Sequence, residues 1–377
     1  MKKIVLIPDS FKGTMSSREI CAILAEEARK VWPEAETISI PVADGGEGSV
    51  DAFLAAVGGK RVEEPCKGPY WEDIAGFYGR LPGDTAVVEM AAAAGLPLAG
   101  DRLCPEQTTT YGVGQLIRAA LRSGAKKVIV GLGGSATNDG GAGMAAALGV
   151  RFLRRAGEVY VPTGGTLEQL ERIDLSGLDP LLEGAEVTAM CDIDNPLCGP
   201  AGASAVFGPQ KGADQAMVER LVRGLGHLAD VAAEALGRDL RDLPGAGAAG
   251  GMGFGMAALL GSRLQMGIDT VLDAVDFAHL LEGADLVITG EGRIDSQSLR
   301  GKVVVGVARR AKASGVPVAA LVGDIGEGAE AVCGQGVTGI FSTNRAAIPF
   351  AQARLRAKED MRLTAANLFR FLGRMGH

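Results

Sequence analysis

Short β-branched runs alternate with helical stretches along the chain, and this alternation narrows the choice of fold more than any other pattern. Residues 3–8, KIVLIP, predict a buried strand, and Ser16 followed by Glu19 has the spacing of a helix-capping box. A second strand is expected at 36–42 and a second helix at 49–58. A βαβα opening of this kind predicts a parallel sheet covered by helices.

Three later segments share one pattern, in which a helix end leads through a Gly-Ala turn into a strand and a polar or glycine-rich loop. They are residues 123–134, 183–194 and 282–293. Residues 285–311 resemble the start of the chain, whereas residues 68–94 alternate like a hairpin. We therefore expect an α/β fold with a Rossmann-like parallel-sheet domain built from both chain ends and a second α/β domain inserted. The predicted domains are residues 1–75 with 285–377, and residues 76–284.

Composition excludes several classes of partner. The net charge of −7 and the 5% aromatic content argue against nucleic-acid binding. No C-x-x-C pair occurs, so a zinc site of the usual spacing is not expected. The first apolar run is too short for a signal peptide, and residues 243–262 are interpreted as a buried glycine-rich loop and helix. We expect a cytoplasmic protein with reduced cysteines and no membrane partner; a homodimer is left open.

Glycine is unusually abundant, with 56 of 377 residues, and it gathers in clusters. The segment 131–149, GLGGSATNDGGAGMAAALG, follows a predicted strand and precedes a predicted helix. Its backbone N–H groups could face an anion, which favours phosphate binding, and the alternative is a tight strand–helix crossing. Walker A and protein-kinase signatures are absent, and GAGAAG at 245–250 does not follow a strand as a dinucleotide fingerprint does. His227 and His279 are expected to be structural.

Polar residues gather in the loops after the predicted strands. In open α/β sheets, ligands bind outside the carboxyl ends of the strands, so these loops are where a site is expected. Each loop contains at least one carboxylate, and for a single aspartate the alternative role is helix capping. The loop residues are Asp9, Ser10 and Lys12; Asp44, Gly45, Gly46 and Glu47; Asn138 and Asp139; Asp192, Asp194 and Asn195; and Glu291, Arg293 and Asp295.

Six motifs give the chain a resemblance to the bacterial type I glycerate kinases (glycerate 2-kinases). Their order and spacing fit that family across almost the whole chain. The motifs are residues 7–17, 41–53, 131–149, 191–213, 245–255 and 289–302. The resemblance implies ATP-dependent phosphorylation of D-glycerate with Mg²⁺, and 2-phosphoglycerate is the product expected for this type.

Roles can be assigned because a kinase needs a phosphate cradle, metal ligands, a cation and a group that orients the attacking hydroxyl. Asp192 is the expected base, with a loop-stabilising Asx turn as its alternative, and Lys12 is the expected catalytic cation. The expected ATP-binding residues are Gly133, Gly134, Ser135, Thr137, Asn138, Asp139 and Lys302. The expected magnesium ligands are Glu291 and Asp295. The expected glycerate-binding residues are Asp9, Ser10, Asp44, Gly45, Gly46 and Arg293.

Two other functions are compatible with parts of the sequence. GLGGSA, at 131–136, differs by one residue from the GLGSSA loop of the homoserine and mevalonate kinase superfamily, which also phosphorylates small alcohols. That interpretation lacks the proline expected before the loop and leaves the DSFKG motif at 9–13 unexplained. A non-catalytic sugar-acid-binding protein is the other alternative, and the retained loop carboxylates argue against it.

Overall fold

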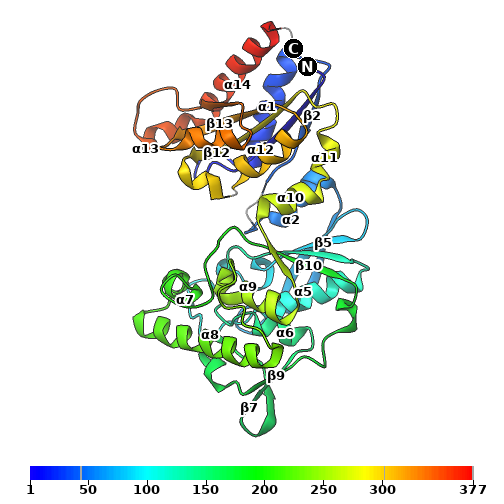
Figure 1. The fold of residues 1–377 in the computed structure, drawn as a ribbon, viewed down its shortest axis with the longest axis vertical. Coiled ribbons are helices and arrows are strands. Elements are labelled where there is room, and N and C mark those ends of the chain that lie inside the picture. The colour runs from blue at the N-terminus through cyan, green and yellow to red at the C-terminus, as the bar shows by residue number, and fades with distance from the viewer. Residues whose placement is uncertain (43–44, 301, 376–377) are drawn as a thin grey trace. The chain divides into compact units, whose positions relative to one another are not determined.

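A computed structural model describes residues 1–42, 45–300 and 302–375, and the chain forms two compact units (Figure 1). Unit 1 comprises residues 1–43, 55–57 and 268–377, and unit 2 comprises residues 44–54 and 58–267. The predicted α/β fold, with a parallel-sheet unit made from both chain ends and a second unit inserted, is confirmed.

The sheet of unit 1 has five strands, all parallel, in the order β14-β13-β12-β1-β2. β1 (Lys3–Pro8) pairs on one side with β12 (Leu286–Ile294) and on the other with β2 (Glu36–Ser39). Figure 1 accordingly shows N-terminal elements in blue and C-terminal elements in orange and red within one unit. The other elements of unit 1 are α10 (Gly267–Ala274), α11 (Phe277–Leu280), η5 (Ser296–Arg300), α12 (Val303–Ala313), β13 (Val318–Ile325), η6 (Ala329–Gln335), β14 (Gly339–Ser342), α13 (Phe350–Ala353), η7 (Arg354–Arg356) and α14 (Ala357–Arg374).

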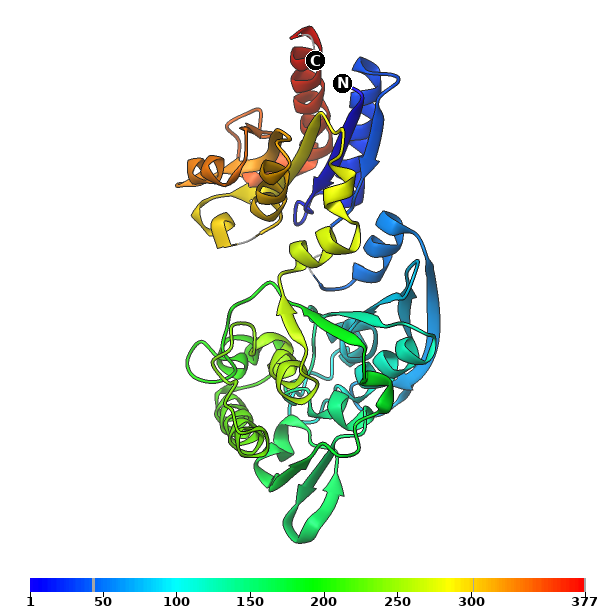
Figure 2. The same ribbon diagram turned by 45° about the vertical axis from the view of Figure 1, so that its right-hand side comes forward.

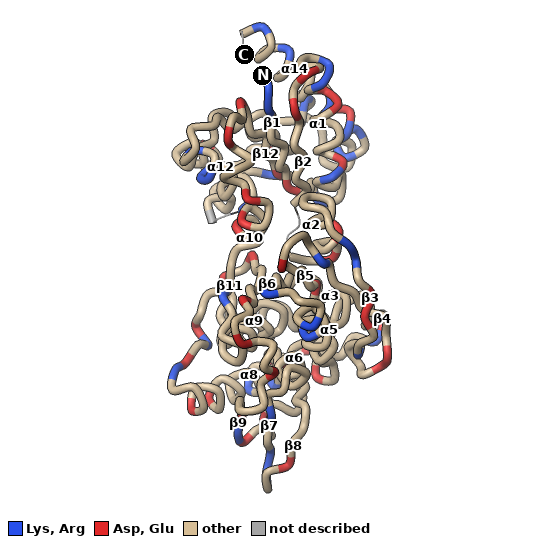
Figure 3. The backbone as a smooth tube through the Cα atoms, turned by 90° about the vertical axis from the view of Figure 1, so that its right-hand side faces the viewer, with Lys and Arg blue, Asp and Glu red and all other residues tan. Residues whose placement is uncertain are grey.

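Helix α1 (Ser17–Val31) begins where the capping box predicts. The Ser16 hydroxyl accepts a hydrogen bond from the Glu19 backbone N–H at 3.2 Å, and the Glu19 carboxylate accepts one from the Ser16 N–H at 2.9 Å. The buried face of α1 packs with α14 in a core shared with the sheet. Acidic and basic residues are mixed along both helices, so their outer faces suit water (Figure 3).

The main sheet of unit 2 has six strands in the order β11-β10-β6-β5-β4-β3. β5, β6, β10 and β11 are parallel, whereas β3 and β4 add to the edge as an antiparallel hairpin. A smaller three-stranded sheet has the order β8-β7-β9, and its β7–β8 hairpin projects from the rest of unit 2 (Figure 2). The strands are β3 (Lys60–Lys67), β4 (Asp73–Arg80), β5 (Thr85–Glu89), β6 (Lys127–Gly131), β7 (Arg151–Arg154), β8 (Glu158–Tyr160), β9 (Arg172–Asp174), β10 (Glu186–Met190) and β11 (Arg263–Gln265). The helices are α2 (Ser49–Val57), α3 (Ala91–Ala94), α4 (Leu96–Ala99), α5 (Tyr111–Arg122), η1 (Arg155–Gly157), α6 (Ala142–Ala147), η2 (Gly164–Gln169), η3 (Pro180–Leu182), α7 (Ala203–Phe207), η4 (Pro209–Lys211), α8 (Gln215–Leu236) and α9 (Ala248–Leu259).

The division between the units differs from the predicted boundaries at residues 75 and 285. β3 and β4 belong wholly to unit 2, because they form a hairpin and because Tyr78 and its neighbours pair with β5. Residues 268–284 belong to unit 1, where Ile268 packs against Gly306 and Arg310 pairs with Asp273 at 2.9 Å. Both differences arise because strand and helix patterns are local, whereas the partner that covers them is distant in sequence.

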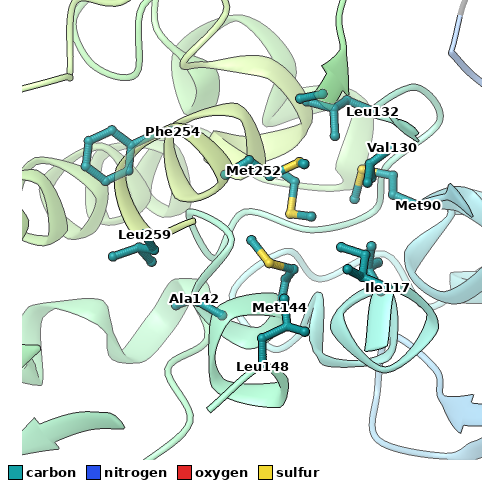
Figure 4. Packing of buried hydrophobic residues seen from close by; sticks show 14 of the residues in the cluster. Met90, Ile117, Val130, Leu132, Ala142, Met144, Leu148, Met252, Phe254 and Leu259 are labelled. Carbon is teal, nitrogen blue, oxygen red and sulfur yellow. The ribbon is translucent and has the colours of Figure 1, made fainter. Parts of the chain in front are cut away.

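The core of unit 2 lies directly beneath the glycine-rich loop that follows β6. Leu132, at one end of this loop, and Ala142, at the other, both lie in the core (Figure 4). Met144 and Met252 fill the space between α6 and α9. α9 is buried along nearly its whole length, as predicted for the apolar stretch 243–262. In the described part of the chain, no helix is both long enough and apolar enough to cross a membrane.

Candidate active site

The residues expected to form the site fall into two groups, one on each unit. Asp44 lies outside the described residues. The group on unit 1 consists of Asp9, Ser10, Lys12, Glu291, Arg293, Asp295 and Lys302. The group on unit 2 consists of Gly45, Gly46, Gly133, Gly134, Ser135, Thr137, Asn138, Asp139 and Asp192.

On unit 1, the register of two neighbouring strands brings two of the expected carboxylates level with each other. Glu291 and Arg293 were expected in a loop after a strand, but they lie within β12 itself, which pairs with β13 as far as Ile294. β1 and β12 pair Pro8 with Gly290, and the backbone N–H of Asp9 donates to the Gly290 carbonyl at 2.8 Å. Asp9 and Glu291 each come one residue after this pair. The turn that carries Lys12 is anchored beside them by Phe11 and Met15, which form an isolated β-bridge.

Glu291 is a buried carboxylate that the protein leaves incompletely paired. The residue is 5% exposed, and its Oε1 atom has no hydrogen-bond partner. Burial, with a smaller contribution from Asp9 and Asp295, raises the pKa of Glu291 to about 6. Ser298 and Lys302 act in the opposite direction. A buried acceptor without a donor is rare in native proteins, so this atom is suited to a ligand that brings a proton or a positive charge.

Arg293, expected to bind the substrate, is occupied by two carboxylates of its own unit. Its guanidinium lies 3.4 Å from Asp295 and 3.7 Å from Asp324. Its side chain is nevertheless 62% exposed, so these ion pairs are weak and can exchange for another anion. Lys302 is the N-cap residue of α12 and lies in this group rather than with the other expected ATP-binding residues.

On unit 2, Gly45 and Gly46 pack against the glycines that follow β6. The backbone N–H of Gly133 donates to the Gly45 carbonyl at 2.8 Å. A Cβ atom on Gly133 would lie 2.5 Å from the Cα atom of Gly46, closer than real Cβ contacts. This close backbone approach requires glycine at Gly133 whether or not a ligand is bound.

The loop after β6 has an exposed rim and a buried interior. Gly134 is exposed and Ser135 is 7% exposed, whereas Thr137, Asn138 and Asp139 are fully buried. The Asn138 amide is paired with the Ser204 hydroxyl at 3.0 Å, inside the unit. Only the rim of the loop therefore faces outward in this conformation.

The anion at the start of α6 is a carboxylate of the chain itself. Asp139 accepts hydrogen bonds from the backbone N–H groups of Gly141 and Gly143 at 3.1 and 3.2 Å, and from Thr110. Burial raises the pKa of Asp139, and these hydrogen bonds oppose that effect. The sequence favoured a phosphate at this helix start, but Asp139 already satisfies its N–H groups and the helix is only six residues long.

The segment 245–250 supports the loop by packing. A Cβ atom on Gly250 would lie 2.0 Å from the Thr137 carbonyl oxygen, and the Gly140 N–H donates to the Gly250 carbonyl at 3.1 Å. Gly250 also has a φ of +67°, a conformation that side chains other than glycine rarely adopt. Two glycine-rich motifs that look independent in the sequence thus form one packed layer.

Asp192 follows β10 and remains exposed. Its Oδ1 atom accepts a hydrogen bond at 2.7 Å from the backbone N–H of Gly267, the last residue of unit 2. A Cβ atom on Gly267 would lie 3.0 Å from this carboxylate, so the contact is tight. This contact is structural, but it spans 75 residues and is not the local Asx turn considered as the alternative to a role as a base.

Lys211 was not among the residues expected to form the site. The residue is 2% exposed, and its Nζ atom donates to the Ser135 hydroxyl at 2.8 Å and to the Thr137 carbonyl at 2.6 Å. Burial lowers the pKa of Lys211 to about 7. The signal available in the sequence was a lysine flanked by Gly208-Pro209 and Gly212, where the turn carries it inward.

The carboxylates of unit 1 suit magnesium better than a metal that needs a complete protein cage. Among the described residues, no group of three or more His, Cys, Asp or Glu is arranged to hold a metal ion. Mg²⁺ usually takes one or two carboxylates and completes its shell with water and substrate phosphates. Glu291 and Asp295, with the unpartnered Oε1 atom, match that donor set.

Kinases of small molecules are the class to which this fold and these loops point, and comparisons with known proteins make the assignment specific. The model of the glycerate kinase family matches residues 4–373. The chain belongs to the glycerate kinase family, so the resemblance found in its motifs is confirmed.

The relatives are similar over nearly the full length of the chain. Glycerate kinase of Bacillus subtilis is 48% identical over 97% of this chain and 96% of its own. Glycerate 2-kinase of Escherichia coli is 46% identical over 90% of both chains. A crystal structure described as glycerate kinase 2 from Salmonella typhimurium LT2 aligns with a TM-score of 0.85 at 43% identity, covering 98% of each chain.

Proposed function

We propose that this chain phosphorylates the 2-hydroxyl group of D-glycerate with ATP and Mg²⁺, yielding 2-phosphoglycerate. As a member of the glycerate kinase family, it is a kinase that phosphorylates glycerate at the expense of ATP. The choice of the 2-hydroxyl is supported by the Escherichia coli relative, which is named glycerate 2-kinase. Family membership also sets aside the homoserine and mevalonate kinase alternative.

The observation that carries the proposal for unit 1 is the unpartnered Oε1 atom of Glu291. We assign Glu291 and Asp295 to Mg²⁺, which would supply positive charge against the phosphate oxygens. Asp9 and Ser10 are assigned to the glycerate hydroxyl groups. Lys12, in the exposed turn after β1, is assigned to an anionic group of the reactants.

For unit 2 we propose that the rim of the loop after β6 binds phosphate groups of ATP. The exposed Gly134 lets phosphate oxygens approach the backbone closely, and the Ser135 hydroxyl can donate to them. Thr137, Asn138 and Asp139 hold the rim in place from inside. Asp192 is assigned to the orientation of the reacting hydroxyl. For this role, its carboxylate must accept a hydrogen bond from the substrate in addition to, or in place of, the one from the Gly267 N–H.

The remaining expected residues are proposed to have supporting roles in the site. Arg293 and Lys302 are proposed as cations that neutralise phosphate or carboxylate charge. Gly45 and Gly46 are proposed to shape the rim through their contacts with Gly133. A cytoplasmic location remains a proposal, supported by six cysteines that are all free thiols.

The direct test is to incubate the purified protein with ATP, Mg²⁺ and D-glycerate and to identify the product by ³¹P and ¹³C NMR. D-glycerate should stimulate ADP release and yield 2-phosphoglycerate, and chelation of Mg²⁺ should abolish turnover. L-glycerate is the matched control for the substrate. Formation of 3-phosphoglycerate would overturn the choice of hydroxyl, and ADP release that is independent of glycerate would contradict the proposed reaction.

A further inference from the structure

The amino group of Lys211 lies inside unit 2, directly beneath the loop after β6. η4 (Pro209–Lys211) carries the side chain inward, and the residue is only 2% exposed. The amino group donates to two acceptors of the loop, the Ser135 hydroxyl at 2.8 Å and the Thr137 carbonyl at 2.6 Å. The Thr137 hydroxyl is also buried and has no partner of its own. The buried amino group of Lys211 therefore supports the segment 135–137 in addition to the apolar core beneath the loop.

The chemistry of these groups fixes the direction of the hydrogen bonds. A charged lysine has three donors and no acceptor, whereas a serine hydroxyl has one donor and two acceptor lone pairs. When Lys211 is charged, the Ser135 oxygen must accept from it, so the Ser135 proton is available to another acceptor. Ser135 lies beside the exposed Gly134, where the loop faces outward.

We propose that Lys211 is a positioning residue for ATP binding: its charged amino group holds the segment Ser135–Thr137 and turns the Ser135 hydroxyl proton outward, toward a phosphate oxygen of the nucleotide. This inference rests on the proposed binding of ATP phosphates by the rim of the loop. Lys211 acts through Ser135 and does not touch the nucleotide itself.

The electrostatic environment suits a group whose charge responds to an anion. Burial disfavours the charged amine and lowers the pKa of Lys211 to about 7, and Asp139 of the same loop favours the charge. Among the described residues, Asp139 is the titratable group that acts on Lys211. A neutral amine has a lone pair, so it can accept the Ser135 proton and turn it away from the rim. A phosphate group at the rim favours the charged amine and therefore the outward orientation.

The test compares Lys211→Met, Ser135→Ala and the double variant for ATP affinity by calorimetry, with KM for ATP and kcat measured separately. Each single variant should weaken ATP affinity about tenfold, as expected for loss of a hydrogen bond to a charged group. The double variant should be no weaker than either single variant, since both remove the same interaction. The effect should appear in KM for ATP rather than in kcat. Lys126→Met, at an exposed lysine of the same unit, is the control.

A pH series separates positioning from a purely structural role. Wild type should bind ATP more tightly than Lys211→Met at pH 7, and this advantage should shrink as the pH rises and the amine loses its charge. The advantage of wild type over Ser135→Ala should shrink over the same pH range. Ser135→Ala keeps the lysine, so it supplies the answer if Lys211→Met does not fold.

The outcomes also distinguish the inference from the proposal on which it rests. If Ser135→Ala binds ATP like wild type, the rim does not bind phosphate as proposed. If Ser135→Ala weakens ATP binding but a folded Lys211→Met does not, phosphate binding by the rim is supported and the role of Lys211 is overturned. Additive losses in the double variant would also overturn the coupling.

Discussion

Asp139 accepts two hydrogen bonds from Thr110, one from its backbone N–H and one from its hydroxyl group, both at 2.8 Å. Thr110 is the N-cap residue of α5, so this contact ties the glycine-rich loop to the start of a helix that packs directly against α6. The Thr110 hydroxyl in turn accepts from the backbone N–H of Met144 at 2.8 Å. The carboxylate thus organises a buried polar network, in which each missing member leaves others unpaired.

Asp139→Ala should lower the free energy of unfolding of unit 2 by about 3 kcal/mol, because several buried N–H groups lose their acceptor. Urea unfolding can be followed by fluorescence, since Trp71 belongs to unit 2 and Trp32 to unit 1. Asp101→Ala, at an exposed carboxylate of the same unit, is the control. An Asp139→Ala variant with wild-type unfolding but no ATP binding would instead indicate a direct ligand contact.

Gly250→Ala should destabilise unit 2 by more than about 2 kcal/mol, because the new methyl group would overlap the Thr137 carbonyl in a left-handed backbone conformation. Gly226→Ala is the matched control. Gly226 lies in α8 with open space around its Cβ position, so alanine there should raise stability by roughly 0.5–1 kcal/mol. Equal effects of the two substitutions on the thermal midpoint would refute the packing role of Gly250.

Asp192→Asn and Glu291→Gln should leave different kinetic traces. Asp192→Asn should lower kcat with little change in the Mg²⁺ requirement, because it weakens a proton acceptor. Glu291→Gln should raise the Mg²⁺ concentration needed for the half-maximal rate. Steady-state kinetics over a Mg²⁺ series measures both effects. The reverse pattern would exchange the two assignments, and wild-type kinetics in both variants would remove these residues from the site.

Lys12→Met should lower kcat/KM by roughly 10- to 150-fold, the range expected for loss of one charge-assisted contact. The substitution keeps the length of the side chain, and the turn should persist because Phe11 and Met15 anchor it. Lys126→Met again serves as the control. A Lys12→Met enzyme with unchanged kcat/KM would show that this turn does not meet the reactants.

Wild type should gain stability relative to Lys211→Met as the pH rises from 7. The pKa of Lys211 is about 7 in the folded chain, whereas an unperturbed lysine, as in the unfolded chain, has a pKa of 10.5. Below pH 7 both states are protonated and folding buries the full charge; above pH 7 the folded state has released its proton while the unfolded state still holds one. Stability therefore rises with pH, by about 2 kcal/mol between pH 7 and 8.5. The free energies of unfolding of wild type and Lys211→Met are measured by urea unfolding at several pH values. A difference between them that stays constant from pH 7 to 8.5 would contradict the lowered pKa.

Local patterns predicted the early elements closely. β1 has the bounds expected from KIVLIP, and the Ser16–Glu19 capping box starts α1. The burial of the Asp139 side chain was not predictable, because its partner Thr110 lies 29 residues away. The sequence of a polar loop does not show which of its side chains point inward. The contact between Lys211 and Ser135 spans 76 residues, and lysines are rarely buried. Glu291 was identified as a polar residue following an apolar run, but it lies within β12 rather than after it, and its unpartnered oxygen depends on packing.

The pairing of β1 with β12 also orders events during synthesis. Thr289 of β12 donates to the Ile7 carbonyl across 282 residues, so β1 waits for its neighbour while the intervening chain is made. At ~5–20 residues per second this interval is roughly 15–55 s. The sequence of unit 2 is complete before β12 leaves the ribosome, so the inserted unit can fold first. Until then β1 has only β2 beside it, and its other edge, which β12 will cover, exposes unpaired backbone groups.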